Sequence, residues 1–309
     1  MFAYKEFERF YYKGFKIFDT CRTPDEVDMT IQTAEWINRL SGKKVFDQSF
    51  IQNLPVSSAN DQLVDYYTFM LEELMMRNEK FQVLQENFRI HVVVSDLLEI
   101  SSNVIQKDAV IIVEWPFIKY IDLLNKETVY SKPEEFSPTV EMLFHKFAHK
   151  YSESKNAEKQ FQLHVEYDPV AFRMCSYMRN IQELFILGHE MGHLILRGSR
   201  ENTEQAADEI AFEGILNYCR KNQILMPFIL RSIMLLFTYM PWLDAGRMQR
   251  REMREKVVER WRDRYDYLFE KLKPYYAEMD DRGKEEVDNC DFICSLIEEI
   301  GFRFMGLVR

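Results

Sequence analysis

The sequence predicts an α+β protein that is predominantly helical. Ten Gly and nine Pro in 309 residues leave few turn markers, which favours long helices over a protein of many strands. Apolar residues recur at helical spacing along most of the chain. Runs of β-branched residues, which are typical of strands, stand at 88–94 and 109–113. We therefore expect a small sheet accompanied by many helices.

The first 80 residues are expected to form a helical N-terminal extension. Thr23 followed by Pro24 is a typical helix start, since Thr caps the helix and Pro fits its first turn. A second helix is predicted over 61–78 from the spacing of its apolar residues.

Residues 81–220 combine the two predicted strands with helices. After the second strand, a helix is expected from Phe117 to Leu124, a loop from Pro133 to Pro138, and another helix over 140–151. The helices predicted further along the chain cover 181–196, 204–220, 224–240, about 244–272 and about 285–300. Residues 221–309 are expected to form a helical C-terminal region that packs on the part before it.

The composition indicates which binding partners and which cellular compartment to expect. Forty basic and fifty acidic residues give a net charge of −10, so we expect no global binding to nucleic acid or to an anionic membrane. The five Cys are odd in number and scattered, which fits a reducing cytoplasm; Cys290 and Cys294 are interpreted as small apolar residues on one helix face. Acidic residues near the start argue against a secretory signal. The apolar segment 224–243 carries Arg231, so a buried core helix is favoured over a membrane span.

The strongest chemical signal is His189-Glu190-Met191-Gly192-His193, an H-E-x-x-H motif. Residues four apart project from one helix face, so both imidazoles can bind one zinc ion. Glu190 is then the expected general base that activates the metal-bound water. Gly192 is unfavourable inside a helix, which predicts that another backbone approaches there.

A third ligand is available eleven residues later. Glu204 and Asp208 are predicted to share one face of the next helix, with Asn202 or Thr203 as its cap. Glu204 can complete the ligand set with His189 and His193, and three protein ligands with one open position are typical of a catalytic zinc site. Asp208 can accept the outer N–H of a ligating His and fix its tautomer.

H-E-x-x-H followed by E-x-x-A-D resembles the gluzincin metallopeptidases, most closely the phage-exclusion Lit-type and ImmA/IrrE-type intracellular bacterial peptidases. The specific resemblance covers about 186–215 and a looser one 88–220. It implies a minimal zincin-like core, in which a small sheet, an active-site helix and a third-ligand helix are wrapped by further helices. It also implies zinc ligands at His189, His193 and Glu204, a base at Glu190 and a supporting Asp208.

Other patterns in the chain are typical of ordinary structural roles. His145 and His149 lack an intervening Glu and are interpreted as parts of an ordinary amphipathic helix. His164 is interpreted as a core or strand residue, with an oxyanion donor as the alternative. The Arg-rich stretch 247–264 is interleaved with acidic residues, which predicts a solvated, salt-bridged helix. Weak candidates for an oxyanion donor are Tyr218, Tyr239 and Arg247.

The sequence therefore predicts a zinc-dependent endopeptidase that cleaves a specific protein in the cytoplasm, with a host-defence or stress role implied by the resemblance. Neither nucleic acid nor membrane is expected as a partner. The main alternative is a non-catalytic metal-binding regulatory protein on a peptidase-like core. A membrane-embedded peptidase that uses 224–243 as its span is a third hypothesis. The target, the trigger and the oligomeric state are not indicated by the sequence.

Overall fold

The computed structural model describes residues 59–95, 100–105, 108–130, 133–152, 169–248 and 250–306. The helix start predicted at Thr23, Cys21 and His164 lie outside these ranges. Packing divides the chain into two compact units. Among the described residues, the first holds 59–72 and Gln85–Trp115, and the second holds Glu73–Leu84 and Pro116 onward. The predicted division at 80 and 220 stays a prediction.

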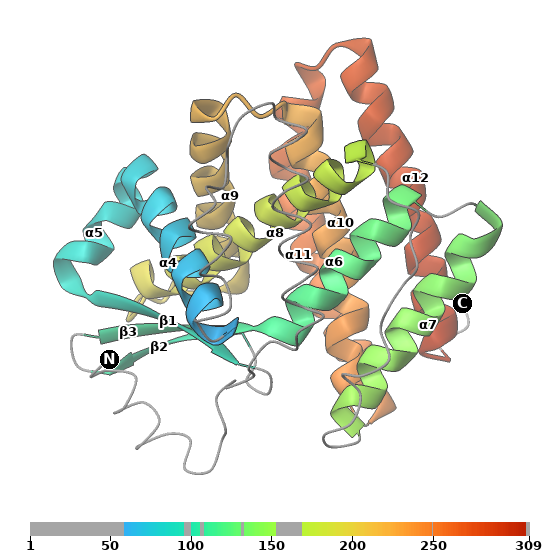
Figure 1. The fold of residues 1–309 in the computed structure, drawn as a ribbon, viewed down its shortest axis with the longest axis horizontal. Helices are drawn as coiled ribbons and strands as arrows, with labels where there is room; N and C mark the ends of the chain where they lie inside the picture. Colours follow the sequence, from blue (N-terminus) through green and yellow to red (C-terminus); the bar gives the residue numbers. More distant parts are fainter. Residues whose placement is uncertain are drawn as a thin grey trace, which may run out of the picture. The chain divides into compact units, whose positions relative to one another are not determined.

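The first unit contains a three-stranded sheet with the order β1-β3-β2 (Figure 1). Its strands are β1 (Arg89–Ser95), β2 (Ser101–Ile105) and β3 (Asp108–Glu114). β1 runs parallel to β3 and β2 antiparallel to it. Both strands predicted from β-branched runs are confirmed. β2 was not predicted, since its Ser-Ser-Asn start lacks that signal and the strand forms by pairing with β3.

Helices make up most of the rest of the described chain, so the prediction of a predominantly helical protein is confirmed. Their bounds are α4 (Ala59–Arg77), α5 (Glu79–Asn87), α6 (Trp115–Tyr130), α7 (Pro133–Ser152), α8 (Pro169–Ile195), α9 (Glu204–Lys221), α10 (Met226–Arg247), α11 (Arg251–Ala277) and α12 (Asp281–Phe304).

The loop predicted from Pro133 to Pro138 is wrong, because α7 begins at Pro133. Proline fits the first turn of a helix, where its missing N–H is not needed, and α7 also accommodates Pro138 in its second turn. The helix expected from 181 begins at Pro169, and residues 244–247, assigned to the following helix, belong to α10. Helix type was thus more predictable than helix ends.

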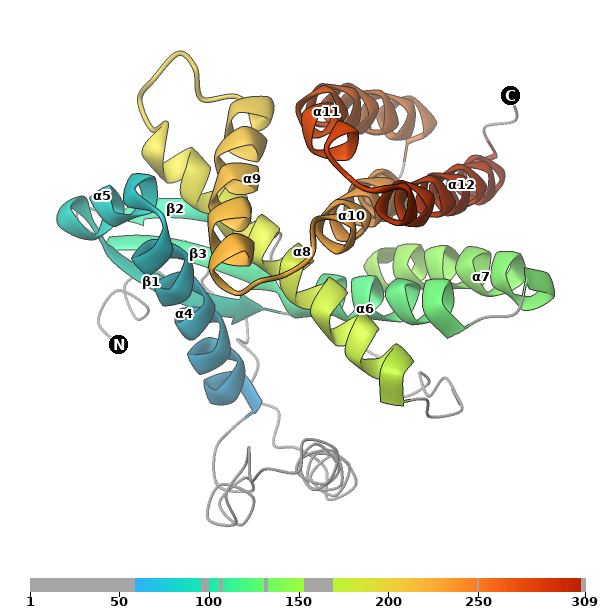
Figure 2. The same ribbon diagram turned by 90° about the horizontal axis from the view of Figure 1, so that it is seen from above.

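Helix α10 forms the centre of the second unit and packs against α7, α8, α11 and α12 (Figure 2). Tyr239, Ile233 and Leu243 on it are fully buried. Among the described residues it is the one helix long and apolar enough to cross a membrane, and 67% of its most apolar window is buried inside the structure. The prediction of a buried core helix in this segment is confirmed.

Cysteines of the second unit are free thiols. Cys290 and Cys294 are buried one turn apart on α12, with their Sγ atoms 4.0 Å apart. Their interpretation as small apolar residues on one helix face is confirmed.

Candidate metal centre

The site is built where α8 and α9 pack against each other, and small residues bring the two backbones together. A Cβ added at Gly192 would lie 3.0 Å from both the Cα and the carbonyl oxygen of Ala207. One turn earlier, a Cβ at Gly188 would lie 3.2 Å from the Cα of Ala211. The backbone approach predicted at Gly192 is confirmed, and it is this approach that lets side chains from the start of α9 reach α8.

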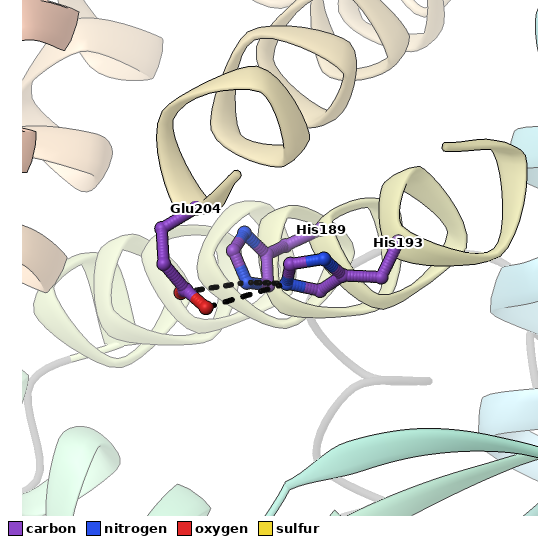
Figure 3. Close-up of side chains that lie close together, drawn as sticks. All are labelled: His189, His193 and Glu204. Carbon is purple, nitrogen blue, oxygen red and sulfur yellow. Dashed lines mark hydrogen bonds and ion pairs between the residues drawn. The ribbon is translucent and has the colours of Figure 1, made fainter. Parts of the chain in front are cut away.

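Three ligand atoms from these helices point toward one another (Figure 3). The Nε2 atoms of His189 and His193 are 3.0 Å apart. One carboxylate oxygen of Glu204 lies 3.5 Å from the first Nε2 and the other lies 3.6 Å from the second. Zinc ligands at ~2.0–2.1 Å in a tetrahedron are separated by about 3.3–3.4 Å, so this triangle has the size that a zinc ion requires.

The orientation of each imidazole ring is fixed by a contact at its Nδ1 atom, the nitrogen that does not face Glu204. Nδ1 of His189 lies 2.8 Å from Oδ1 of Asp208, a carboxylate that can only accept. Nδ1 of His193 lies 2.8 Å from Oδ1 of Asn202. Both Nδ1–H groups therefore donate outward, which leaves the Nε2 lone pairs directed at Glu204. The cap of α9 is Thr203, whose hydroxyl accepts from the backbone N–H of Ala206, so Asn202 is free to hold the imidazole.

The electrostatics of the cluster favour a positive charge at its centre. Burial lowers the pKa of His189, but its contacts with Asp208 and Glu204 outweigh burial and raise that pKa to about 9. The contact with His189 is likewise the main cause that lowers the pKa of Glu204 to about 2. Two Nε2 lone pairs and a carboxylate repel one another unless a proton or a metal ion lies between them. The donor set therefore fits zinc, which both imidazole and carboxylate bind.

A buried arginine that the sequence patterns do not single out, Arg264, contacts two carboxylates of the site. Arg264 on α11 binds both oxygens of Asp208, at 2.8 and 2.7 Å, and one oxygen of Glu204 at 2.9 Å. The interpretation of 247–264 as a solvated helix is wrong at this position, because Arg264 is 5% exposed and Asp208 is fully buried. The local signal for its burial is Trp261, three residues earlier, because an apolar residue at that spacing places Arg264 on the inner face of the charged helix.

The expected general base, Glu190, stands next to His189 on α8 and is 6% exposed. The three weak candidates for an oxyanion donor make their contacts elsewhere. Tyr239 shares a hydrogen bond with Thr128 in the core. Arg247 donates to Asp244, and the ring of Tyr218 lies beneath the guanidinium of Arg77.

His145 is exposed on α7, 3.9 Å from Glu141, and its ring packs on Phe304. This agrees with its interpretation as part of an amphipathic helix. The side chain of His149 lies outside the described part of the structure.

Comparisons with protein-family models, with curated proteins and with solved structures found no match to this chain. Function is therefore inferred from the residues of the site themselves.

Proposed function

We propose that the protein is a zinc-dependent endopeptidase that hydrolyses a peptide bond in a specific intracellular protein. The observation that carries the proposal is the convergence of His189, His193 and Glu204 on one point, with the outer nitrogen of each imidazole already held by an acceptor. Three protein ligands that leave a fourth position open are typical of catalytic zinc, whereas structural sites use four.

A zinc ion bound there supplies Lewis acidity, which lowers the pKa of water and polarises a carbonyl group. Glu190 takes the proton of the attacking water and delivers it to the leaving amine. Its position directly after His189, in the H-E-x-x-H motif on α8, supports this role. Asp208 and Asn202 hold the imidazoles in the tautomer that leaves Nε2 free.

The order of these residues supports membership in the gluzincin type, with His189, Glu190 and His193 on one helix and Glu204 and Asp208 at the start of the next. A zincin-like core that joins the three-stranded sheet to α8 and α9 is part of the same proposal. An experimental structure that fixes the sheet relative to α8 tests that part. A host-defence or stress role in the cytoplasm extends the proposal by resemblance alone.

The test has two stages. Elemental analysis of purified protein should give one zinc per chain, and the variant His193→Ala should lose it. The variant Glu190→Gln should keep the zinc and lose cleavage by about 10²–10⁴-fold, the usual contribution of a general base. Since the target is unknown, cleavage is measured as new protein N-termini in cells that express wild type or Glu190→Gln.

Zinc bound at full stoichiometry with identical N-termini in both strains would instead support the non-catalytic regulatory alternative. Cleavage that persists at the wild-type rate in Glu190→Gln would refute the role of this residue while leaving the metal site intact.

A further inference from the structure

Arg264 makes more contacts with the proposed metal centre than neutralising a buried charge requires. Its Nε and Nη2 atoms donate to the two oxygens of Asp208 at 2.8 and 2.7 Å, a bidentate pair. Its remaining terminal nitrogen, Nη1, lies 2.9 Å from Oε2 of Glu204. One guanidinium thus binds the carboxylate that orients His189 and the carboxylate of the third ligand.

The position of the guanidinium is itself fixed by packing. Its Cζ lies 3.8 Å from the centre of the Trp261 ring and 5.7 Å from that of Phe237, and the side chain is nearly inaccessible to solvent. A planar fork held against aromatic rings directs its N–H groups along set directions, which the single ammonium of a lysine cannot reproduce. Helix α11 therefore imposes a geometry on the first turns of α9.

Arg264 contacts one of the two carboxylate oxygens of Glu204, and this affects which oxygen can bind the metal. Oε2 of Glu204 forms an ion pair with Nη1 of Arg264 at 2.9 Å and lies 3.5 Å from Nε2 of His189. The other oxygen, Oε1, is not the one that Arg264 contacts, and it lies 3.6 Å from Nε2 of His193. We infer that Arg264 is a positioning residue that keeps Glu204 monodentate through Oε1, so that a coordination position on the metal stays open. This inference rests on the proposed zinc site.

A purely structural role for Arg264 gives a different expectation. Asp208 is completely buried, and a buried carboxylate without a cation is costly, so any cation at position 264 would satisfy a structural need. Only the guanidinium fork can hold Asp208 by both oxygens and Glu204 at the same time. The conservative variant Arg264→Lys separates the two roles, because it keeps the charge and loses the fork.

The experiment compares wild type, Arg264→Lys and Arg260→Lys, each as the full chain. Arg260 lies one turn earlier on α11, half-exposed and 3.7 Å from Asp244, so it serves as the matched control. Zinc affinity is measured by competition with a chromophoric chelator. Coordination is read from the visible absorption of the Co²⁺-substituted protein, which is stronger for four-coordinate than for five-coordinate cobalt.

Arg264→Lys is expected to bind zinc about 10–100-fold more weakly, the usual effect of losing a partner of a metal ligand. Its cobalt absorption should weaken as Glu204 becomes bidentate. Arg260→Lys should match wild type in both measurements. Unchanged zinc affinity and an unchanged cobalt spectrum in folded Arg264→Lys would overturn the inference.

A wild-type protein that takes up no zinc would overturn the proposed function itself, and the first titration reveals this before any variant is compared. If Arg264→Lys does not fold, a crystal structure of zinc-loaded wild type decides. Arg264 on Oε2 with zinc on Oε1 is the expected arrangement, and bidentate Glu204 would overturn the inference.

Discussion

Replacing Gly192 by Ala tests whether the close packing of α8 and α9 sets the geometry of the metal centre. The new Cβ would meet the Cα and carbonyl oxygen of Ala207 at 3.0 Å, where ordinary contacts begin at 3.4 Å, so the helices must separate by about 0.4 Å. Overpacking of this kind costs about 1–3 kcal/mol, of which the better helix propensity of Ala returns about 1 kcal/mol. The net loss of stability in the metal-free protein is therefore only about 0–2 kcal/mol.

Gly192→Ala should weaken zinc binding markedly, even though the metal-free protein loses little stability. Metal–ligand distances tolerate about 0.2 Å, and His193 and Glu204 stand on opposite sides of the strained contact. We expect zinc binding to weaken by about tenfold or more, measured by chelator competition at constant pH. Urea unfolding in the presence of EDTA gives the stability of the metal-free protein separately.

Gly188→Ala is the matched comparison, because it places the same methyl group between the same helices one turn away. Its Cβ would lie 3.2 Å from Ala211, so a smaller separation is sufficient and a smaller effect on zinc affinity is expected. Gly192→Ala protein that binds zinc as tightly as wild type would refute the reasoning that this contact sets the ligand distances. A larger loss of zinc affinity in Gly188→Ala than in Gly192→Ala would also refute it.

Three further outcomes are expected. Asn202→Ala removes the acceptor for Nδ1 of His193, so zinc affinity should fall about 10–100-fold in chelator competition while metal-free stability changes little; unchanged affinity would contradict the role of Asn202. Because carboxylates raise the pKa of His189 to about 9, zinc must displace one proton below that pH, so affinity should rise about tenfold per pH unit from pH 6.5 to 9. Over the same interval the metal-free protein should lose stability, because the folded site stabilises the protonated imidazole of His189. Calorimetry of zinc binding in two buffers should show that one proton is released per zinc bound. Release of no proton would contradict the raised pKa of His189. Gly301→Ala would place a Cβ 2.2 Å from the buried ring of Trp242, so urea unfolding should show a loss of about 3 kcal/mol or more, and a loss below about 0.5 kcal/mol would contradict this packing.

The parts of the protein that the sequence predicted correctly are those that depend on neighbouring residues. Helical periodicity identified α9 to within one residue at its end, and β-branched runs identified β1 and β3. The spacing of His189 and His193 places them on one helix face in any fold, so their meeting was determined locally. The unfavourable Gly192 even indicated that a second backbone would lie beside them.

What the sequence by itself determined, then, is the helical character of the chain and the set of residues able to bind a metal. Only the tertiary structure decided which partners surround that set. Arg264 stands 56 residues after Asp208 on a helix whose charges look solvated, and β2 is a strand because β3 lies beside it. Such contacts depend on how distant segments pack, and no pattern within a single helix or strand records them.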